Sequence, residues 1–161
     1  MATKKKQPAT PKEVIINLGE VDADLNQKWP WKDNSIDEAV AVNLLHYLKP
    51  DDRIHFVNEL CRVLKVDGKA QVQVPYWCSN RAFADLNVAW PPVSEGWFFF
   101  LDKAWREANV PKETRYTCNF SPTWGYNLHP AISTRNQEYQ QHAVTFWKEA
   151  SQDLCATLTK L

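Results

Sequence analysis

The first half of the chain alternates between short apolar runs and one long segment of helical periodicity. Residues 13–18 form an isoleucine-rich run that Gly19 ends, and they predict a buried strand. Residues 36–43 predict a strand that is buried on both faces, because the middle of this segment is almost continuously apolar. Residues 69–76 alternate apolar and polar side chains, which predicts a third strand.

A helix is predicted over residues 50–65, between the second and third strands. Pro50 suits a first helical turn, and the carboxylates of Asp51 and Asp52 would lie at the positive end of the helix dipole. The order strand, helix, strand implies parallel pairing through a helical crossover, and therefore an α/β fold. One face of the helix is apolar at helical spacing: Ile54, Val57, Leu60, Cys61 and Leu64.

The second half of the chain predicts mainly helices, followed by a closing strand. Trp97, Leu101 and Trp105 are spaced to share one face of a helix. The aromatic run from Trp90 to Trp105 is either a cap that packs on the sheet or an exposed patch that binds a second copy of the chain. The predicted elements are helices over 79–90, 94–108 and 135–151, strands over 115–120 and about 153–160, and an irregular connection over 123–130.

The chain has 161 residues, which predicts one domain, over residues 13–161. Residues 1–12 predict a disordered basic arm, because four of the 19 basic residues and no acidic residue lie there. The remainder carries 15 basic and 19 acidic residues, and a body of that sign is a poor binder of nucleic acid. Nucleic acid is therefore not the expected partner, and contact through Lys4–Lys6 is the alternative.

Several classes of site are excluded by residue counts and spacing. The 4 glycines are too far apart for a glycine-rich phosphate loop. The 4 cysteines form no C-x-x-C pair, so we expect free thiols in a reducing compartment. The 4 histidines show no metal-ligand spacing, so no metal is expected. No signal peptide and no apolar run approaching roughly 18 residues is present, which predicts a cytoplasmic protein without membrane contact.

A series of short motifs runs from Asp24 to Pro75. It comprises Asp24-Leu25, the segment from Trp29 to Asp37 (WPWKDNSID), Leu45-His46-Tyr47-Leu48, the segment from Glu59 to Gly68 (ELCRVLKVDG), and Val74-Pro75. In order and spacing this series resembles the second half of class I S-adenosylmethionine-dependent methyltransferases. The rest of the chain resembles the tail of small predicted methyltransferases, some of them encoded by phages. The resemblance implies a Rossmann-like sheet, a helical cap and a final antiparallel strand.

The resemblance also implies that part of the family fold is missing. In the family, the first strand ends in a G-x-G loop that wraps the cofactor, and residues 15–19 resemble that strand. Only the four residues 20–23 separate Gly19 from Asp24, whereas a crossover between parallel strands needs roughly 10–12 residues. Residues 21–25 therefore either extend the first strand as one bent segment, or only one of the two enters the sheet. Either way we expect a methyltransferase sheet truncated at its N-terminal βαβ unit, with half of the ligand crevice absent.

By resemblance, the cofactor is S-adenosylmethionine. Asp24 and Leu25 would contact its adenine through a carboxylate and a backbone N–H, unless Asp24 only caps a turn. Asn43 would orient the acceptor by hydrogen bonds, or else satisfy backbone groups at the strand end. His46 would be a general base, or else a structural histidine. The implied cofactor-binding residues are Gly19, Asp24, Leu25, Asn43 and Leu44, and the implied catalytic residues are Asn43 and His46.

The other motif residues are expected to be structural. Asp37 begins a strand, and Glu59 and Arg62 are placed to form a local pair. Tyr76 and Trp77 follow the carboxyl end of the third strand, where they could line a pocket.

Two functions fit these patterns. One is an S-adenosylmethionine-dependent methyltransferase whose methyl acceptor the sequence does not indicate. The other is a catalytically inactive methyltransferase-fold module that binds a partner. The loss of a βαβ unit would uncover sheet and edge, so a homo-oligomer is an expected assembly in which a second copy fills the missing half.

Overall fold

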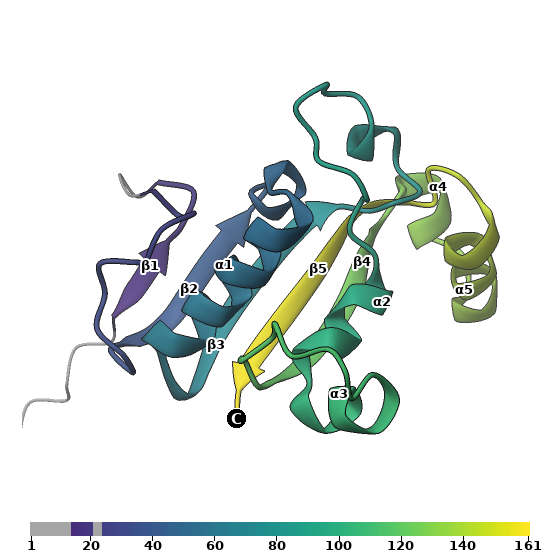
Figure 1. Ribbon diagram of the computed structural model, residues 1–161. Helices are drawn as coiled ribbons and strands as arrows, with labels where there is room; N and C mark the ends of the chain where they lie inside the picture. The colour runs from purple at the N-terminus through teal and green to yellow at the C-terminus, as the bar shows by residue number, and fades with distance from the viewer. Residues whose placement is uncertain (1–13, 21–23) are drawn as a thin grey trace, which may run out of the picture.

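Five strands form one mixed sheet in the computed structural model, which describes residues 14–20 and 24–161 (Figure 1). The predicted arm at residues 1–12 lies outside the described residues. Parallel pairing joins β1 to β2 and β2 to β3, and β5 is antiparallel to both β3 and β4. The predicted α/β fold with a final antiparallel strand is therefore confirmed. The sheet order is β1 (Ile15–Asn17), β2 (Ile36–Val42), β3 (Leu64–Pro75), β5 (Ser151–Lys160) and β4 (Phe120–Leu128).

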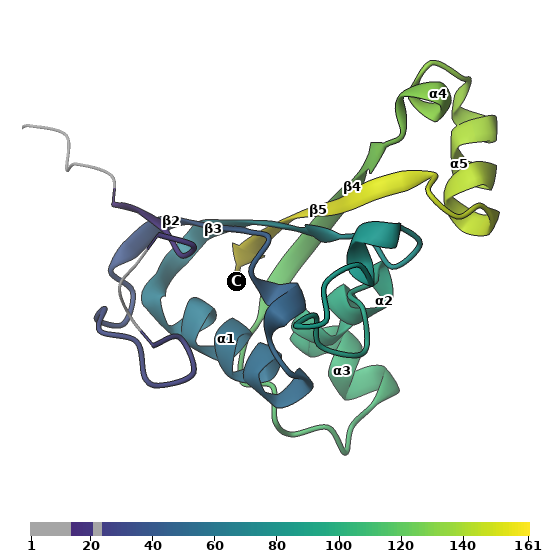
Figure 2. The ribbon, with the colours of Figure 1, turned by 90° about the horizontal axis from the view of Figure 1, so that it is seen from above.

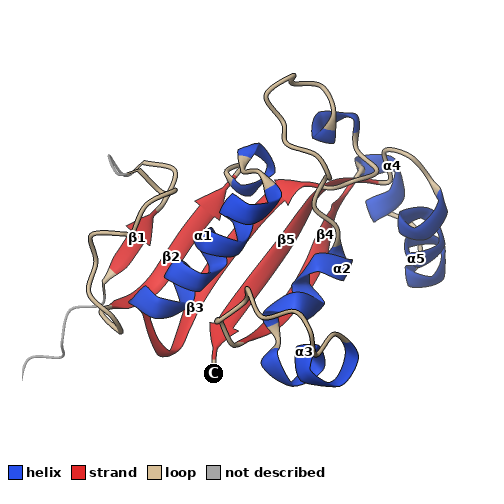
Figure 3. Ribbon diagram, viewed as in Figure 1, coloured by secondary structure: helices blue, strands red, loops and turns tan. Residues whose placement is uncertain are grey.

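Helix α1 (Pro50–Val63) is the predicted crossover between β2 and β3. It starts at Pro50 as expected and ends two residues earlier than expected, because Leu64 already pairs with Ile36 of β2. Figure 3 shows the remaining short helices in blue. They are η1 (Leu45–Tyr47), η2 (Asn80–Ala82), α2 (Glu95–Phe98), η3 (Phe99–Leu101), α3 (Lys103–Asn109), α4 (Pro130–Ser133) and α5 (Gln137–Phe146).

Helices α1, α2 and α3 cover one face of the sheet, and α4 and α5 lie beyond one end of β4 and β5 (Figure 2). The covered face carries the core, with side chains such as Ala41, Val72 and Leu154 that are buried. No helix of the described residues lies on the opposite face, which we call the open face. The open face is mostly polar: Val42, Gln71, Gln73, Thr123, Cys155 and Thr157.

The N-terminal strands are less buried than the sequence predicts. Ile15 in β1 is 57% exposed and Val42 in β2 is 44% exposed. The sequence predicted a buried strand at 13–18 and a strand buried on both faces at 36–43, but β1 is an edge strand and only one face of β2 carries helices. Of the predicted strand at 21–25, residues 21–23 lie outside the described residues, and Asp24 and Leu25 are not in a strand.

The predicted helices at 79–90 and 94–108 are wrong in extent. Residues 83–91 form a loop, since the Arg53 guanidinium binds the carbonyl groups of Ala89 and Pro91 and so stabilises a non-helical backbone. The second helix is interrupted at Asp102, whose carboxylate accepts the Trp105 N–H at 3.1 Å and begins α3 anew. Phe98 and Leu101 of the aromatic run are buried, and the rings of Phe98 and Phe99 contact Trp124 of β4, which supports the interpretation as a cap.

A long strand occupies the segment that was predicted to be irregular. β4 begins at Phe120, and most of the strand predicted at 115–120 has no regular structure. Pro122 and Gly125 are tolerated in β4 because it is an edge strand with one free side. The helix predicted at 135–151 is confirmed only over Gln137–Phe146.

Candidate functional site

The carboxyl ends of β1, β2 and β3 meet at one edge of the sheet, since the three strands are parallel. Gly19 follows β1, Asn43 follows β2, and Pro75 ends β3. The Asn43 N–H donates to the Gln73 carbonyl at 2.8 Å, and the positive φ of 52° at Asn43 turns the chain out of the sheet. In open α/β sheets, ligands bind outside this edge.

Gly19 is exposed at this edge, and its backbone has no positive φ. A Cβ atom added there would meet only the Asn17 side chain, at 3.6 Å. The described part of the chain therefore does not require glycine at this position.

Asp24 and Leu25 have local structural contacts. An Asp24 carboxylate oxygen accepts the Asn26 N–H at 3.0 Å, so Asp24 caps a turn, as the alternative interpretation held. The Leu25 carbonyl accepts the Trp29 indole N–H at 3.1 Å, and its half-buried side chain packs on the core. The second carboxylate oxygen of Asp24 has no hydrogen bond within the described residues. It is the atom that a cofactor could use.

His46 is buried directly after the site edge. His46 lies in η1 and is 5% exposed. Its Nδ1 atom has no hydrogen-bond partner among the described residues. The Ala89 N–H donates to the His46 carbonyl at 2.9 Å, so the 83–91 loop is bonded to η1 beside the ring. Leu44 beside it is half-buried and packs on the core. A buried nitrogen without a partner is uncommon and marks the ring as a functional candidate.

Burial lowers the pKa of His46 below its ordinary value of 6.5, and the positive charges of Arg53 and Arg81 lower it further. The ring is therefore neutral at neutral pH. A neutral imidazole is the form that accepts a proton, so its charge state suits a general base.

An acidic residue that the sequence analysis missed lies on β5 beside this edge. Asp153 is 2% exposed and forms an ion pair with Arg81 of η2 at 2.5 Å. The side-chain amides of Gln73 and Asn127 donate to it at 3.2 and 3.0 Å. Asp153 thereby fastens η2 to the end of the sheet. A single carboxylate within an apolar and threonine-rich strand was the available signal.

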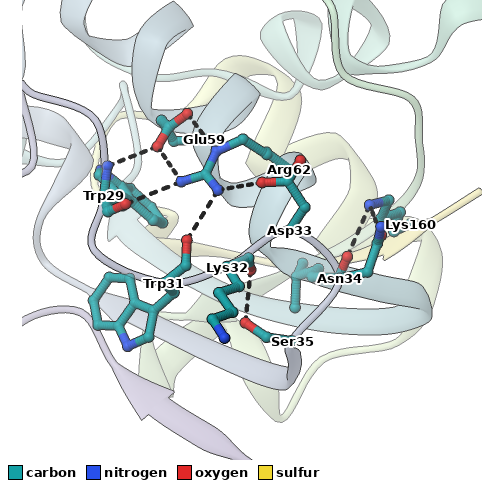
Figure 4. Close-up of polar contacts among 10 residues, drawn as sticks. Trp29, Trp31, Lys32, Asp33, Asn34, Ser35, Glu59, Arg62 and Lys160 are labelled. Atoms are coloured by element: carbon teal, nitrogen blue, oxygen red, sulfur yellow. Dashed lines mark hydrogen bonds and ion pairs between the residues drawn. The ribbon is translucent and has the colours of Figure 1, made fainter.

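The WPWKDNS motif forms a loop that α1 holds in place (Figure 4). The Arg62 guanidinium donates to the carbonyl groups of Trp29 and Trp31 and forms ion pairs with Asp33 and Glu59, each at 2.6 Å. The hydrogen bond from Arg62 lowers the pKa of Glu59, which also accepts the Trp29 N–H at 2.7 Å. This part of the motif is therefore structural.

Two further motif contacts are structural as well. Lys65 bonds both Asp37 carboxylate oxygens at 2.7 Å and so joins the start of β2 to that of β3. The Lys160 ammonium donates to the side chain of Asn34 at 2.8 Å, which ties β5 to the motif loop (Figure 4).

Other kinds of site receive no support in residues 14–20 and 24–161. No group of three or more His, Cys, Asp or Glu side chains there could hold a metal ion. No helix in this part of the chain is long and apolar enough to cross a membrane. The four cysteines are free thiols, of which Cys78 and Cys118 are buried.

Comparison with known proteins identifies the fold. Residues 1–72 match a family model described as a methyltransferase domain. A SAM-dependent methyltransferase from Archaeoglobus fulgidus aligns over 87% of this chain with a TM-score of 0.61 at 11% identity. The chain has a Rossmann-like methyltransferase fold. A SAM-dependent methyltransferase from Thermotoga maritima aligns over 86% of it with a TM-score of 0.51 at 17% identity.

A third methyltransferase structure contains ligands. The 1,6-didemethyltoxoflavin-N1-methyltransferase from Burkholderia thailandensis, with bound 1,6-didemethyltoxoflavin and S-adenosylhomocysteine, aligns over 87% of this chain with a TM-score of 0.50 at 14% identity. This methyltransferase-fold chain covers 66%, 62% and 49% of the Archaeoglobus, Thermotoga and Burkholderia structures, so it spans about half to two thirds of their length. No curated protein matches it.

Proposed function

We propose that the chain binds S-adenosylmethionine at the carboxyl edge of β1 and β2 and transfers its methyl group to an acceptor. The observation that supports the proposal is that Gly19 and Asn43 follow the carboxyl ends of the parallel strands β1 and β2, with His46 in the next element, within a methyltransferase fold. The edge offers an open backbone at Gly19, an exposed amide at Asn43 and a buried neutral imidazole at His46. Gly19 would make room for the cofactor, Asn43 would orient the acceptor, and His46 would act as the base.

The cofactor would lie against Gly19 and the Asn43-Leu44 backbone. The free carboxylate oxygen of Asp24 and the backbone N–H of Leu25 would hold its adenine. S-adenosylmethionine supplies an already activated methyl group when bound, so the protein has to align the acceptor and exclude water. Leu44 packs on the core and so holds the Asn43 backbone in position.

His46 would take a proton from an acceptor hydroxyl or amine. The low pKa of the ring keeps it ready to accept a proton at neutral pH. The ring is covered in the described conformation, so the 83–91 loop would have to move for an acceptor to reach it.

Calorimetric titration and thermal shift with S-adenosylmethionine and S-adenosylhomocysteine test cofactor binding. Gly19→Val places a branched side chain where only the Asn17 side chain is near, so the fold should survive and binding should weaken at least tenfold. Gly125→Val on the exposed edge strand is the matched control and should bind as the unchanged protein does. Absence of heat and of any thermal shift at millimolar cofactor would contradict the proposal.

A catalytically inactive interaction module is the second candidate. One carboxylate oxygen of Asp24 already caps a turn, and the open face offers a broad polar surface to a partner. In this alternative the family's first βαβ unit is absent from the domain, and a second copy covers the open face. Transfer of labelled methyl groups from S-adenosylmethionine to any cell fraction would exclude it, whereas a dimer that forms without cofactor and transfers nothing would favour it.

A further inference from the structure

An aromatic cavity lies past the carboxyl end of β3. Trp77 follows the end of β3 by two residues, Phe83 follows η2, and Phe146 and Trp147 lie at the end of α5. Together with Cys78 and Lys148 these residues line a cavity of about 310 Å³, which we call the aromatic pocket. Its volume is at the lower end of the range for small-molecule sites, roughly 300–1,000 Å³.

The four aromatic side chains are unusually accessible. Trp77, Phe83, Phe146 and Trp147 are 44%, 53%, 71% and 42% exposed. Single exposed apolar residues need no explanation, but four rings from three separate segments line one hollow here. Burial of this surface by a flat ring would be favourable at roughly 25 cal/mol for each Å² removed from water.

Two of the three segments that line the pocket, the one after β3 and the one after α5, are fixed to each other. The Glu149 N–H donates to the Cys78 carbonyl at 3.1 Å, and the Tyr76 N–H donates to the Gln152 carbonyl at 3.1 Å. Trp147 packs edge-on against Tyr139, with ring centroids 5.3 Å apart. Because these two walls are already joined, a ligand would lose little free energy in ordering them.

Lys148 gives the pocket a charge preference. Its side chain lines the cavity, and no carboxylate of the described residues forms an ion pair with it. A ligand anion could pair with this free ammonium group while its ring lies against the tryptophans and phenylalanines. A cationic ligand would meet the repulsion of Lys148.

We infer that the aromatic pocket binds a small planar aromatic molecule with a carboxylate or similar anionic group, and that this molecule is the methyl acceptor. The acceptor role rests on the proposed function. The pocket adjoins the carboxyl edge, since Trp77 follows Pro75 and η2 is fastened to β5 through Arg81 and Asp153. An acceptor bound there would lie past the carboxyl end of β3, the strand that neighbours β2 in the sheet.

Calorimetric titration of the full chain with 2-naphthoate, without cofactor, tests the pocket. Two matched probes separate the contributions: 2-naphthylmethylammonium keeps the ring and reverses the charge, and cyclohexanecarboxylate keeps the charge and lacks the aromatic ring. We expect 2-naphthoate to bind at least tenfold more tightly than either. Equal binding of the three probes, or no binding of 2-naphthoate, would overturn the inference.

Variants identify the location of binding. Phe146→Ala should weaken 2-naphthoate binding at least tenfold, and its fold should survive because Phe146 is 71% exposed. Lys148→Gln should remove the preference for the anionic over the cationic probe. Trp90→Ala is the control, since Trp90 is 75% exposed and does not line the pocket, and its affinity should be unchanged. Equal weakening by Trp90→Ala would place binding elsewhere and overturn the inference.

Two measurements separate this inference from the proposed function and from competing occupants. If 2-naphthoate binds and S-adenosylmethionine does not, the acceptor role and the proposed function fail while the pocket stands. If the cofactor binds and 2-naphthoate does not, only the pocket fails. Sedimentation that shows a dimer, converted to monomer by Phe146→Ala, would assign the rings to a second copy and overturn the inference.

Discussion

Gly68 is held tightly at the start of the β2–β3 pair. A Cβ atom added there would lie 2.8 Å from the Lys65 carbonyl oxygen and 3.1 Å from that of Asp37. Both neighbours are backbone atoms and cannot rotate away. Gly68→Ala should therefore lower the free energy of unfolding by about 1–3 kcal/mol, measured by urea denaturation.

The control for this variant is Gly125→Ala. No atom lies within 4 Å of a Cβ atom added at Gly125. Its free energy of unfolding should stay within about 0.5 kcal/mol of the unchanged protein. An equal loss in both variants would show that alanine is unfavourable in these strands for a reason other than steric contact.

His46 should titrate below pH 6.5, its ordinary value, because burial and two arginines disfavour the charged ring. As the pH drops below about 6.5, His46 is protonated in the unfolded chain but stays neutral in the folded chain. The free energy of unfolding therefore falls in this pH range. NMR titration of the histidine ring signals, assigned with His46→Gln, measures the midpoint. A midpoint above 6.5 would contradict the environment described for the ring.

At the scale of residues, sequence reasoning found positions better than roles. It placed Asn43 at the end of the second strand, and Asn43 directly follows β2. Whether Asp24 capped a turn depended on the Asn26 N–H, and whether the Asp153 carboxylate was paired depended on Arg81, which is 72 positions away. Contacts of this kind leave no periodic signal in a sequence.

At the scale of elements, the motif loop is held onto α1 mainly by Arg62. Its side chain is 19% exposed, and it binds two carbonyl groups and two carboxylates. Arg62→Ala should lower the free energy of unfolding by roughly 2–4 kcal/mol, since it leaves these acceptors without a donor. Urea denaturation measures the change.

Arg115→Ala is the matched control for Arg62→Ala. Arg115 pairs with Glu113 and Asp51, but its side chain is 59% exposed. Exposed ion pairs contribute little, so the loss should stay below about 1 kcal/mol. Similar losses in the two variants would mean that the loop is not fastened through Arg62.

The helices and strands whose apolar side chains recur at a regular spacing were predicted, and the other elements were not. The apolar face of α1 and the alternation of β3 depend only on local sequence. The break before α3 depends on one aspartate side chain, and the 83–91 loop depends on Arg53 from a distant helix. Residues 123–130 were predicted as an irregular connection, but pairing with β5 makes most of them part of β4.

At the scale of the whole molecule, the sheet has one covered and one open face. Val72 is buried on the covered face, and Val72→Ala should lower the free energy of unfolding by about 2 kcal/mol. Thr123 is exposed on the open face, and Thr123→Ala should change it by at most about 0.5 kcal/mol. Equal losses would indicate that a partner covers the open face in solution, as the interaction module requires.

The whole-molecule prediction from sequence was correct in class and incomplete in detail. Strand–helix–strand order gave the parallel half, and the family resemblance gave the closing antiparallel strand. The sequence also suggested that part of the sheet would be uncovered. It did not show that the uncovered surface would be polar. The polar side chains of the open face come together only when strands that are far apart in the sequence, such as β2 and β5, join the same sheet.

The position of β5 has a consequence for the order of assembly during synthesis. β5 is the last strand along the chain, yet it lies between β3 and β4, and Lys69 pairs with Thr159. A growing chain that has completed α5 therefore still carries β3 with one free edge and β4 with no neighbouring strand. The sheet closes only when the final strand enters between two that are already made, so the half-made protein exposes edges on which a chaperone, or another nascent chain, can add a strand.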